Sequence, residues 1–82
     1  IRVSVLLQHY EGDEYWSALV PLIDGCFADG RTPEEATEKI TPEIEDWVES
    51  NPGLLEVLEK QPRFMITEIP LVLREKGAKT NA

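Results

Sequence analysis

The feature that most constrains this sequence is a helix start near its middle, Thr32-Pro33-Glu34-Glu35. A threonine hydroxyl can accept a backbone N–H from the first turn of a helix, and proline is favoured at the first helical position, where its missing N–H would bond nothing. A glutamate two residues after that proline can complete a capping box. The sequence therefore predicts a helix that begins at Pro33 with Thr32 as its N-cap.

The residues after this start have the pattern of a helix with one buried face. Their apolar side chains recur at intervals of three or four and fall within about 120° of arc at roughly 100° per residue. They are Ala36, Ile40, Ile44, Trp47 and Val48. Roughly the opposite side carries four glutamates, Glu34, Glu38, Glu45 and Glu49.

Pro42 interrupts this pattern, because proline has no N–H to bond the carbonyl of Glu38 and costs about 3 kcal/mol in a helix interior. The apolar stripe keeps its phase across Pro42, so our first interpretation is a single kinked helix. The second interpretation is two consecutive helices, with Thr41 and Pro42 repeating the cap-then-proline start. Glu43 favours some change of phase, since it falls near the apolar stripe of an unbroken helix.

The residues before the helix predict three strands. In the first ten positions four apolar residues alternate with mostly polar ones, as in a half-buried strand; they are Ile1, Val3, Val5 and Leu7. A polar turn at 11–14 joins this strand to a second one at 15–20, which is rich in aromatic residues and ends at Pro21. A third, short strand at 26–28 lies between two Asp-Gly turns.

The residues after the helix complete one domain, residues 1–73. Ser50-Asn51-Pro52-Gly53 is a stop signal, and residues 54–60 then form a short helix or a turn, with Asn51 as a possible cap. Residues 63–69 predict a fourth strand, which ends before Pro70. The tail, residues 74–82, lacks apolar periodicity and is predicted to be disordered.

The element order is therefore strand, strand, strand, helix, strand, which is an α+β fold with one helix on one face of a small sheet. The other sheet face lacks a cover. Leu6 and Leu19 fall on that face, opposite their more apolar neighbours. We therefore expect a homo-oligomer formed through the sheet face or an edge strand.

The charge of the chain limits its partners. Sixteen acidic and eight basic residues give a formal net charge of −8 over 82 residues, which disfavours a broad phosphate-binding surface. The basic residues gather after residue 59, so residues 1–59 are strongly acidic. An acidic surface on the helix, at Glu34, Glu38, Glu45 and Glu49, is therefore expected to attract a basic partner.

The reactive residues are few and poorly spaced for catalysis. Cys26 is the only cysteine in the sequence, so the chain can form neither an internal disulfide nor a multi-cysteine zinc site. We expect Cys26 to be a small buried hydrophobe and the protein to be cytoplasmic. His9 has no second histidine or cysteine at ligand spacing. The carboxylates mostly fall in turns, loops and the helix face. We therefore expect no enzyme activity, no catalytic or metal-binding residues, no cofactor and no membrane segment.

The run from Tyr15 to Ala36 resembles the HicB-like antitoxin family. Its parts occur in the family's order: an aromatic-rich strand ending in proline, an apolar pair, a Gly-Cys turn, a small-residue strand, and a Thr-x-x-Glu-Ala helix start. The resemblance covers roughly residues 1–50 well and the fourth strand less specifically. The positions that match the family pattern carry structural roles; they are Pro21, Gly25, Cys26, Thr32, Glu35 and Ala36.

This resemblance implies a partial ribonuclease-H-like β-β-β-α-β fold, in which the fourth strand lies parallel to the first and makes the sheet mixed. It also implies a non-enzymatic antitoxin that binds and blocks a small basic RNA-cleaving toxin, HicA. Many members add a DNA-binding segment, but only about nine residues remain from Arg74, so we expect no direct DNA binding. The alternative function is an orphan oligomeric scaffold or small-ligand-binding module of the same fold. Asp24, where the family often has proline, and Pro42 depart from the family pattern.

Overall fold

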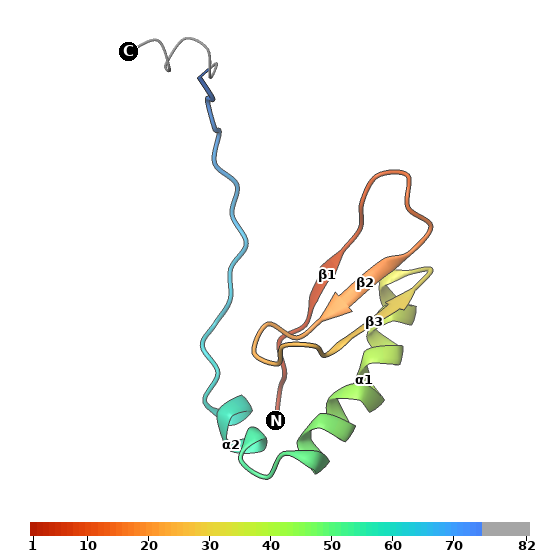
Figure 1. The fold of residues 1–82 in the computed structure, drawn as a ribbon, viewed down its shortest axis with the longest axis vertical. Coiled ribbons are helices and arrows are strands. Elements are labelled where there is room, and N and C mark those ends of the chain that lie inside the picture. Colours follow the sequence, from red (N-terminus) through yellow and green to blue (C-terminus); the bar gives the residue numbers. More distant parts are fainter. Residues whose placement is uncertain (75–82) are drawn as a thin grey trace.

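The computed structural model describes residues 1–74 (Figure 1). A three-stranded antiparallel sheet has the order β1 (Leu6–Gln8), β2 (Trp16–Leu19) and β3 (Phe27–Gly30). The long helix α1 (Pro33–Ser50) packs across one face of the sheet, and the short helix α2 (Leu54–Glu59) follows near its C-terminal end (Figure 1). The expected α+β class, with one helix covering one sheet face, is confirmed.

The register of the sheet assigns each strand residue to one of two faces. Leu7 pairs with Ala18 and Ala18 with Ala28, and this row faces α1, where Ala18 is fully buried. The neighbouring row, Leu6 with Leu19 and Leu19 with Phe27, lies on the opposite face because alternate side chains of a strand point in opposite directions. Leu6 and Leu19 therefore lie on the uncovered face, as the alternation predicts.

Helix α1 begins as the capping pattern predicts. The Glu35 backbone N–H donates to Thr32 Oγ1 at 3.0 Å, and Pro33 occupies the first helical position. The Glu35 carboxylate accepts from the backbone N–H of Arg31 at 2.7 Å, one residue earlier than a standard capping box requires. This bond secures the junction between β3 and α1.

The helix then continues without a break through Pro42 to Ser50. The alternative of two consecutive helices is therefore wrong. The buried face explains the continuity, because Ala36 and Ile40 before the proline and Ile44, Trp47 and Val48 after it all contact the same core.

The core is small and forms where α1 crosses the sheet. Its buried members come from β2, the loop before β3, α1 and α2: Ala18, Val20, Ile23, Cys26, Ala36, Ile40 and Leu58. Gly30 lets β3 approach the start of α1 closely, since a Cβ at this position would lie 2.8 Å from the Glu35 carbonyl carbon. Leu58 is 1% exposed, so the short helix predicted as one alternative for residues 54–60 is part of the core.

Asn51 ends α1 rather than capping α2. Its backbone N–H donates to the Val48 carbonyl at 3.3 Å, and its side-chain amide donates to the Trp47 carbonyl at 2.7 Å. Gly53 occupies the N-cap position of α2. The sequence Ser50–Gly53 is thus a helix stop, as predicted, but Asn51 serves the preceding helix.

The predicted fourth strand at 63–69 does not form in the described part of the chain. Just before this segment, the side-chain amide of Gln61 accepts from the Ser4 backbone N–H at 3.2 Å and donates to the Arg2 carbonyl. Two main-chain groups with which a parallel strand could pair are therefore bonded by a side chain instead. The observed sheet is antiparallel rather than mixed. From residue 75 on, the tail predicted to be disordered lies outside the described residues.

Candidate functional site

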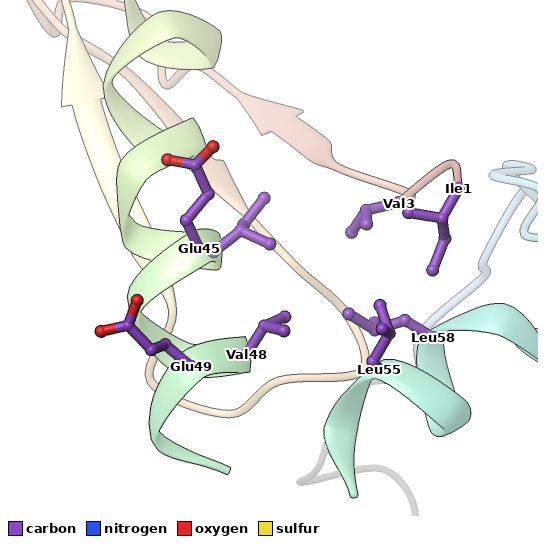
Figure 2. A pocket seen from close by; sticks show the side chains of 8 residues that line it. Ile1, Val3, Glu45, Val48, Glu49, Leu55 and Leu58 are labelled. Carbon is purple, nitrogen blue, oxygen red and sulfur yellow. The ribbon is translucent and has the colours of Figure 1, made fainter. Parts of the chain in front are cut away.

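A groove on the helical side of the molecule lies next to the predicted acidic surface (Figure 2). It has a volume of about 450 Å³. Its apolar lining comes from the N-terminal segment, α1 and α2, and consists of Ile1, Val3, Ile44, Val48, Leu55 and Leu58. Glu45 and Glu49 form its edge along α1 (Figure 2).

Three segments of the chain form the walls of this groove. The C-terminal half of α1 carries Ile44 and Val48, which belong to the same stripe as the buried Ile40. Helix α2 turns back at Gly53 so that the buried Leu58 forms the floor and Leu55, 42% exposed, forms a wall. Gln61 fixes the N-terminal segment beside α2 through its bonds to residues 2 and 4.

The acidic edge of the groove is free of ion pairs within residues 1–74. Glu45 and Glu49 lie one helical turn apart, and the described salt bridges on α1 and α2 join Lys39 to Glu35 and Lys60 to Glu56 instead. The last turn of α1 contains no basic residue, so the negative end of the helix dipole adds to these two carboxylates. The edge of the groove therefore favours a cation beside an apolar group.

The four glutamates singled out in the sequence lie on one exposed stripe, here called the acidic stripe: Glu34, Glu38, Glu45 and Glu49. At roughly 100° per residue they fall within about 60° of arc and extend over about 22 Å of helix. Glu34 and Glu38 line a separate hollow of about 370 Å³ with Leu7, Pro33 and Thr37. The stripe therefore joins two apolar recesses, one at each end of α1.

The residues that match the family pattern lie together where the sheet meets α1. Pro21 follows β2 in a turn that is held by the bond from the Ile23 N–H to the Val20 carbonyl, 3.1 Å. Gly25 has φ +91°, a conformation that side chains disfavour, and a Cβ there would lie 3.5 Å from the Trp47 ring. Cys26 is 1% exposed, so it packs in the core.

Thr32, Glu35 and Ala36 form the start of α1. Thr32 and Glu35 make the capping bonds already described, and Ala36 is fully buried against Gly30. The six family-pattern positions therefore have structural roles. None of them lines the groove.

Cys26 has the properties of a packed thiol rather than a nucleophile. Burial, and next the negative charge of Glu43, raise the pKa of this thiol above its ordinary value. A raised pKa lowers the fraction of thiolate, which is the reactive form. The side chain therefore contributes packing at neutral pH.

His9 is a hairpin residue. Its ring stacks on Trp16 with a centroid distance of 4.8 Å, and its Nε2 lies 2.8 Å from the Asp13 carbonyl oxygen. Among residues 1–74, no group of three or more histidine, cysteine, aspartate or glutamate side chains is placed to hold a metal ion. No helix in the same part of the chain is long and apolar enough to cross a bilayer.

Comparison of this chain with family models, curated proteins and solved structures found no match.

Sequence reasoning found the acidic stripe but missed the groove beside it. The alternation of the first ten residues places Ile1 and Val3 on the apolar face of a strand, and Leu55 and Leu58 fall in a segment predicted to be a short helix or a turn. The groove exists because α2 folds back toward residues 1–4, a long-range contact made through Gln61. The local sequence Gln61-Pro62 does not indicate that the glutamine side chain binds residues near the N-terminus.

Proposed function

We propose that this chain is a non-enzymatic, HicB-like antitoxin that binds a small basic RNA-cleaving toxin of the HicA type in the cytoplasm. The observation that carries the proposal is the acidic stripe of α1 beside an apolar groove. A basic protein with one apolar side chain among its lysines or arginines fits this combination. Neutralisation would follow from covering the toxin's basic, RNA-binding surface.

The charges and the groove have different parts in this binding. Exposed carboxylates along about 22 Å of helix speed the approach of a basic surface and favour it over an acidic one. The apolar groove supplies the buried contact, because a few well-packed apolar anchors dominate the affinity of most protein interfaces. Residues 1–59 hold fourteen acidic and three basic side chains, so much of the molecule repels RNA and attracts RNA-binding proteins.

The fold supports the same family in part. The order β1, β2, β3, α1 and the capped start of α1 agree with the family pattern. The ribonuclease-H-like arrangement would require residues 63–69 to pair with β1; they form no strand in the described structure, although Phe64 and Ile66 line a hollow together with Leu6 of β1.

The test is co-purification with a small basic protein, of about 60 to 80 residues, sought in the adjacent reading frame. The double substitution Glu45→Lys with Glu49→Lys should weaken the complex at least tenfold and restore growth arrest by the toxin. The matched control, Glu11→Lys with Glu14→Lys in the hairpin loop, makes the same change of net charge away from the groove and should bind nearly as well as the native chain. Equal loss in both variants would mean that net charge, and not this site, governs binding.

A second candidate function is a small-ligand-binding module built on the same scaffold, and the groove itself favours it. Its volume of about 450 Å³ and its mostly apolar lining are typical of small-molecule sites. The substitution Val48→Trp would fill the groove while leaving the acidic stripe in place. Binding of an apolar dye by the native chain, lost in this variant, together with no binding of a basic toxin by the native chain would favour the small-ligand function.

A further inference from the structure

The segment that follows Gln61 exposes a row of large apolar side chains. Residues 62–74 leave α2 as an extended stretch, pass the sheet on its β1 side and continue beyond it (Figure 1). Among them Met65 is 88% exposed, Val72 90% and Leu73 79%, and Ile69 and Leu71 are exposed to a similar degree. Contiguous apolar surface of this kind marks a contact with another molecule.

One side of this segment lies along its own sheet without being buried by it, since Ile66 on that side is still 74% exposed. Phe64 and Ile66 line a hollow of about 260 Å³ together with Leu6 and Pro21. In an extended chain alternate side chains point to opposite sides, so the intervening residues point away from the body. We call the apolar members of that side the outer row: Met65, Ile69, Leu71 and Leu73.

The far part of the segment also extends past the chain's own sheet. The Gln61 side chain holds the start of the segment beside Arg2 and Ser4, and β1 ends at Gln8. From Ser4 to Gln8 the strand advances about 13 Å, whereas the segment advances about 40 Å from Gln61 to Leu73 at about 3.3 Å per residue. Ile69, Leu71 and Leu73 therefore lie past the end of β1, where a second molecule can reach them.

The open face of the sheet offers a matching surface. Leu6, Leu19 and Phe27 lie side by side across its three strands and form what we call the open row, in which Phe27 is 62% exposed. Beside Leu19 and Phe27 lies a hollow of about 450 Å³ that Pro21 and Asp24 also line. This surface is apolar and concave in part, and its β3 side, at Phe27, is exposed, whereas Leu6 lies beside Phe64 and Ile66 of the same chain.

The charges around the two rows are complementary. Arg63 and Arg74 stand at the two ends of the outer row, and residues 60–74 hold three basic side chains and one acidic one. Asp24 lines the hollow beside the open row, and Asp29 lies on the same sheet face, where its Oδ1 accepts from Ser17 Oγ at 2.8 Å. The open row with its aspartates and the outer row with its arginines belong to the same chain. Two copies can therefore each supply the surface that the other needs, which favours a second copy as the partner.

We propose that two copies of this chain form a dimer by exchanging their C-terminal segments. The outer row of each copy lies against the open row of the other, with one of its two flanking arginines near Asp24 and Asp29. Because both copies give a segment and receive one, the contact closes on itself, as two-fold symmetry requires. The acidic stripe and the groove on the helical side stay exposed in this dimer.

The first test is the mass of the native chain and of one donor variant by size-exclusion chromatography with light scattering at micromolar concentration. The native chain should give the mass of a dimer, and Ile69→Asp with Leu71→Asp should halve it. A matched control, Tyr10→Asp with Val57→Asp, changes two exposed apolar residues in the hairpin loop and α2 and should remain a dimer. A native monomer, or equal dissociation of the control, would overturn the proposal.

The second test separates exchange from other dimers. Phe27→Asp alters the receiving surface and should also give a monomer. A mixture of this variant with the donor variant should form a weaker heterodimer, because one intact segment still meets one intact open row. Failure of the mixture to associate would show that like surfaces contact each other, which contradicts exchange. All of the substituted side chains are exposed, and circular dichroism melting checks that each monomer is folded. Loss of toxin binding does not affect either readout, so the two proposals can fail separately.

Discussion

At the scale of single residues, Gly30 determines how closely β3 can approach α1. A Cβ at this position would lie 2.8 Å from the Glu35 carbonyl carbon and 2.9 Å from Ala36 Cα, and both are backbone atoms that cannot turn aside. Gly30→Ala should therefore lower the free energy of unfolding by about 1 to 3 kcal/mol, as overpacking does elsewhere. Urea denaturation measures this change.

Gly53 supplies the matched control for that prediction. No atom lies within 4 Å of a Cβ built there, and its φ of −86° suits any residue. Gly53→Ala should leave stability unchanged or raise it by about 0.5 kcal/mol, because alanine restricts the unfolded chain more than glycine does. Equal losses in the two variants would place the effect in chain flexibility and not in the contact with α1.

Cys26 makes stability depend on alkaline pH. Its thiol has a raised pKa in the folded chain, owing first to burial and then to Glu43. The folded state therefore keeps a proton that the unfolded state loses, and stability is full below the ordinary thiol pKa of about 8.5 and falls as pH rises through that value. Urea denaturation between neutral and alkaline pH should show a steeper loss for the native chain than for Cys26→Ala. Parallel pH profiles would contradict the prediction.

At the scale of elements, packing against the core keeps α1 continuous although Pro42 disfavours a helix at that point. Pro42 lies inside the helix and leaves the Glu38 carbonyl without its usual partner, yet core contacts before and after it keep one helix. Pro42→Ala should therefore raise the free energy of unfolding by about 1 to 2 kcal/mol, since the regained helical bond outweighs the greater freedom of the unfolded chain.

Pro33→Ala is the control for this prediction, because the first helical position makes no N–H bond within the helix. It should change stability little. Thermal melting followed by circular dichroism at the helix band compares the two variants. A loss of stability in Pro42→Ala would mean that the fold requires the proline's geometry at this point.

The elements also show where sequence reasoning succeeds and where it stops. The start of α1 at Thr32 and Pro33 and the stop before Pro52 depend on neighbouring residues, so both could be predicted. The faces of β1 and β2 followed from alternation, because one side is buried by α1. The absence of pairing at 63–69 and the bonds of Gln61 to residues 2 and 4, nearly sixty positions away, are long-range features that a local pattern does not contain. The groove was missed for the same reason.

At the scale of the whole molecule, a small core and a large exposed apolar segment make stability depend on association. Seven apolar side chains are buried among the described residues, whereas six large apolar side chains after residue 64 are mostly exposed. A chain of this size buries a modest share of its surface on folding. Burial of the outer row in the proposed dimer would add apolar contact that the single chain lacks.

The melting temperature should therefore rise with protein concentration. If the folded state is a dimer and the unfolded state a monomer, a hundredfold increase in concentration stabilises the dimer by about 2.7 kcal/mol, and this raises the midpoint by about 5 to 10 °C for two chains of this length. Scanning calorimetry over that range should show the rise for the native chain and for Tyr10→Asp with Val57→Asp. The donor variant Ile69→Asp with Leu71→Asp should melt at one temperature at every concentration, because its folded state is a monomer. A native midpoint independent of concentration would mean that the exposed segment adds nothing to the stability of the fold through a second copy.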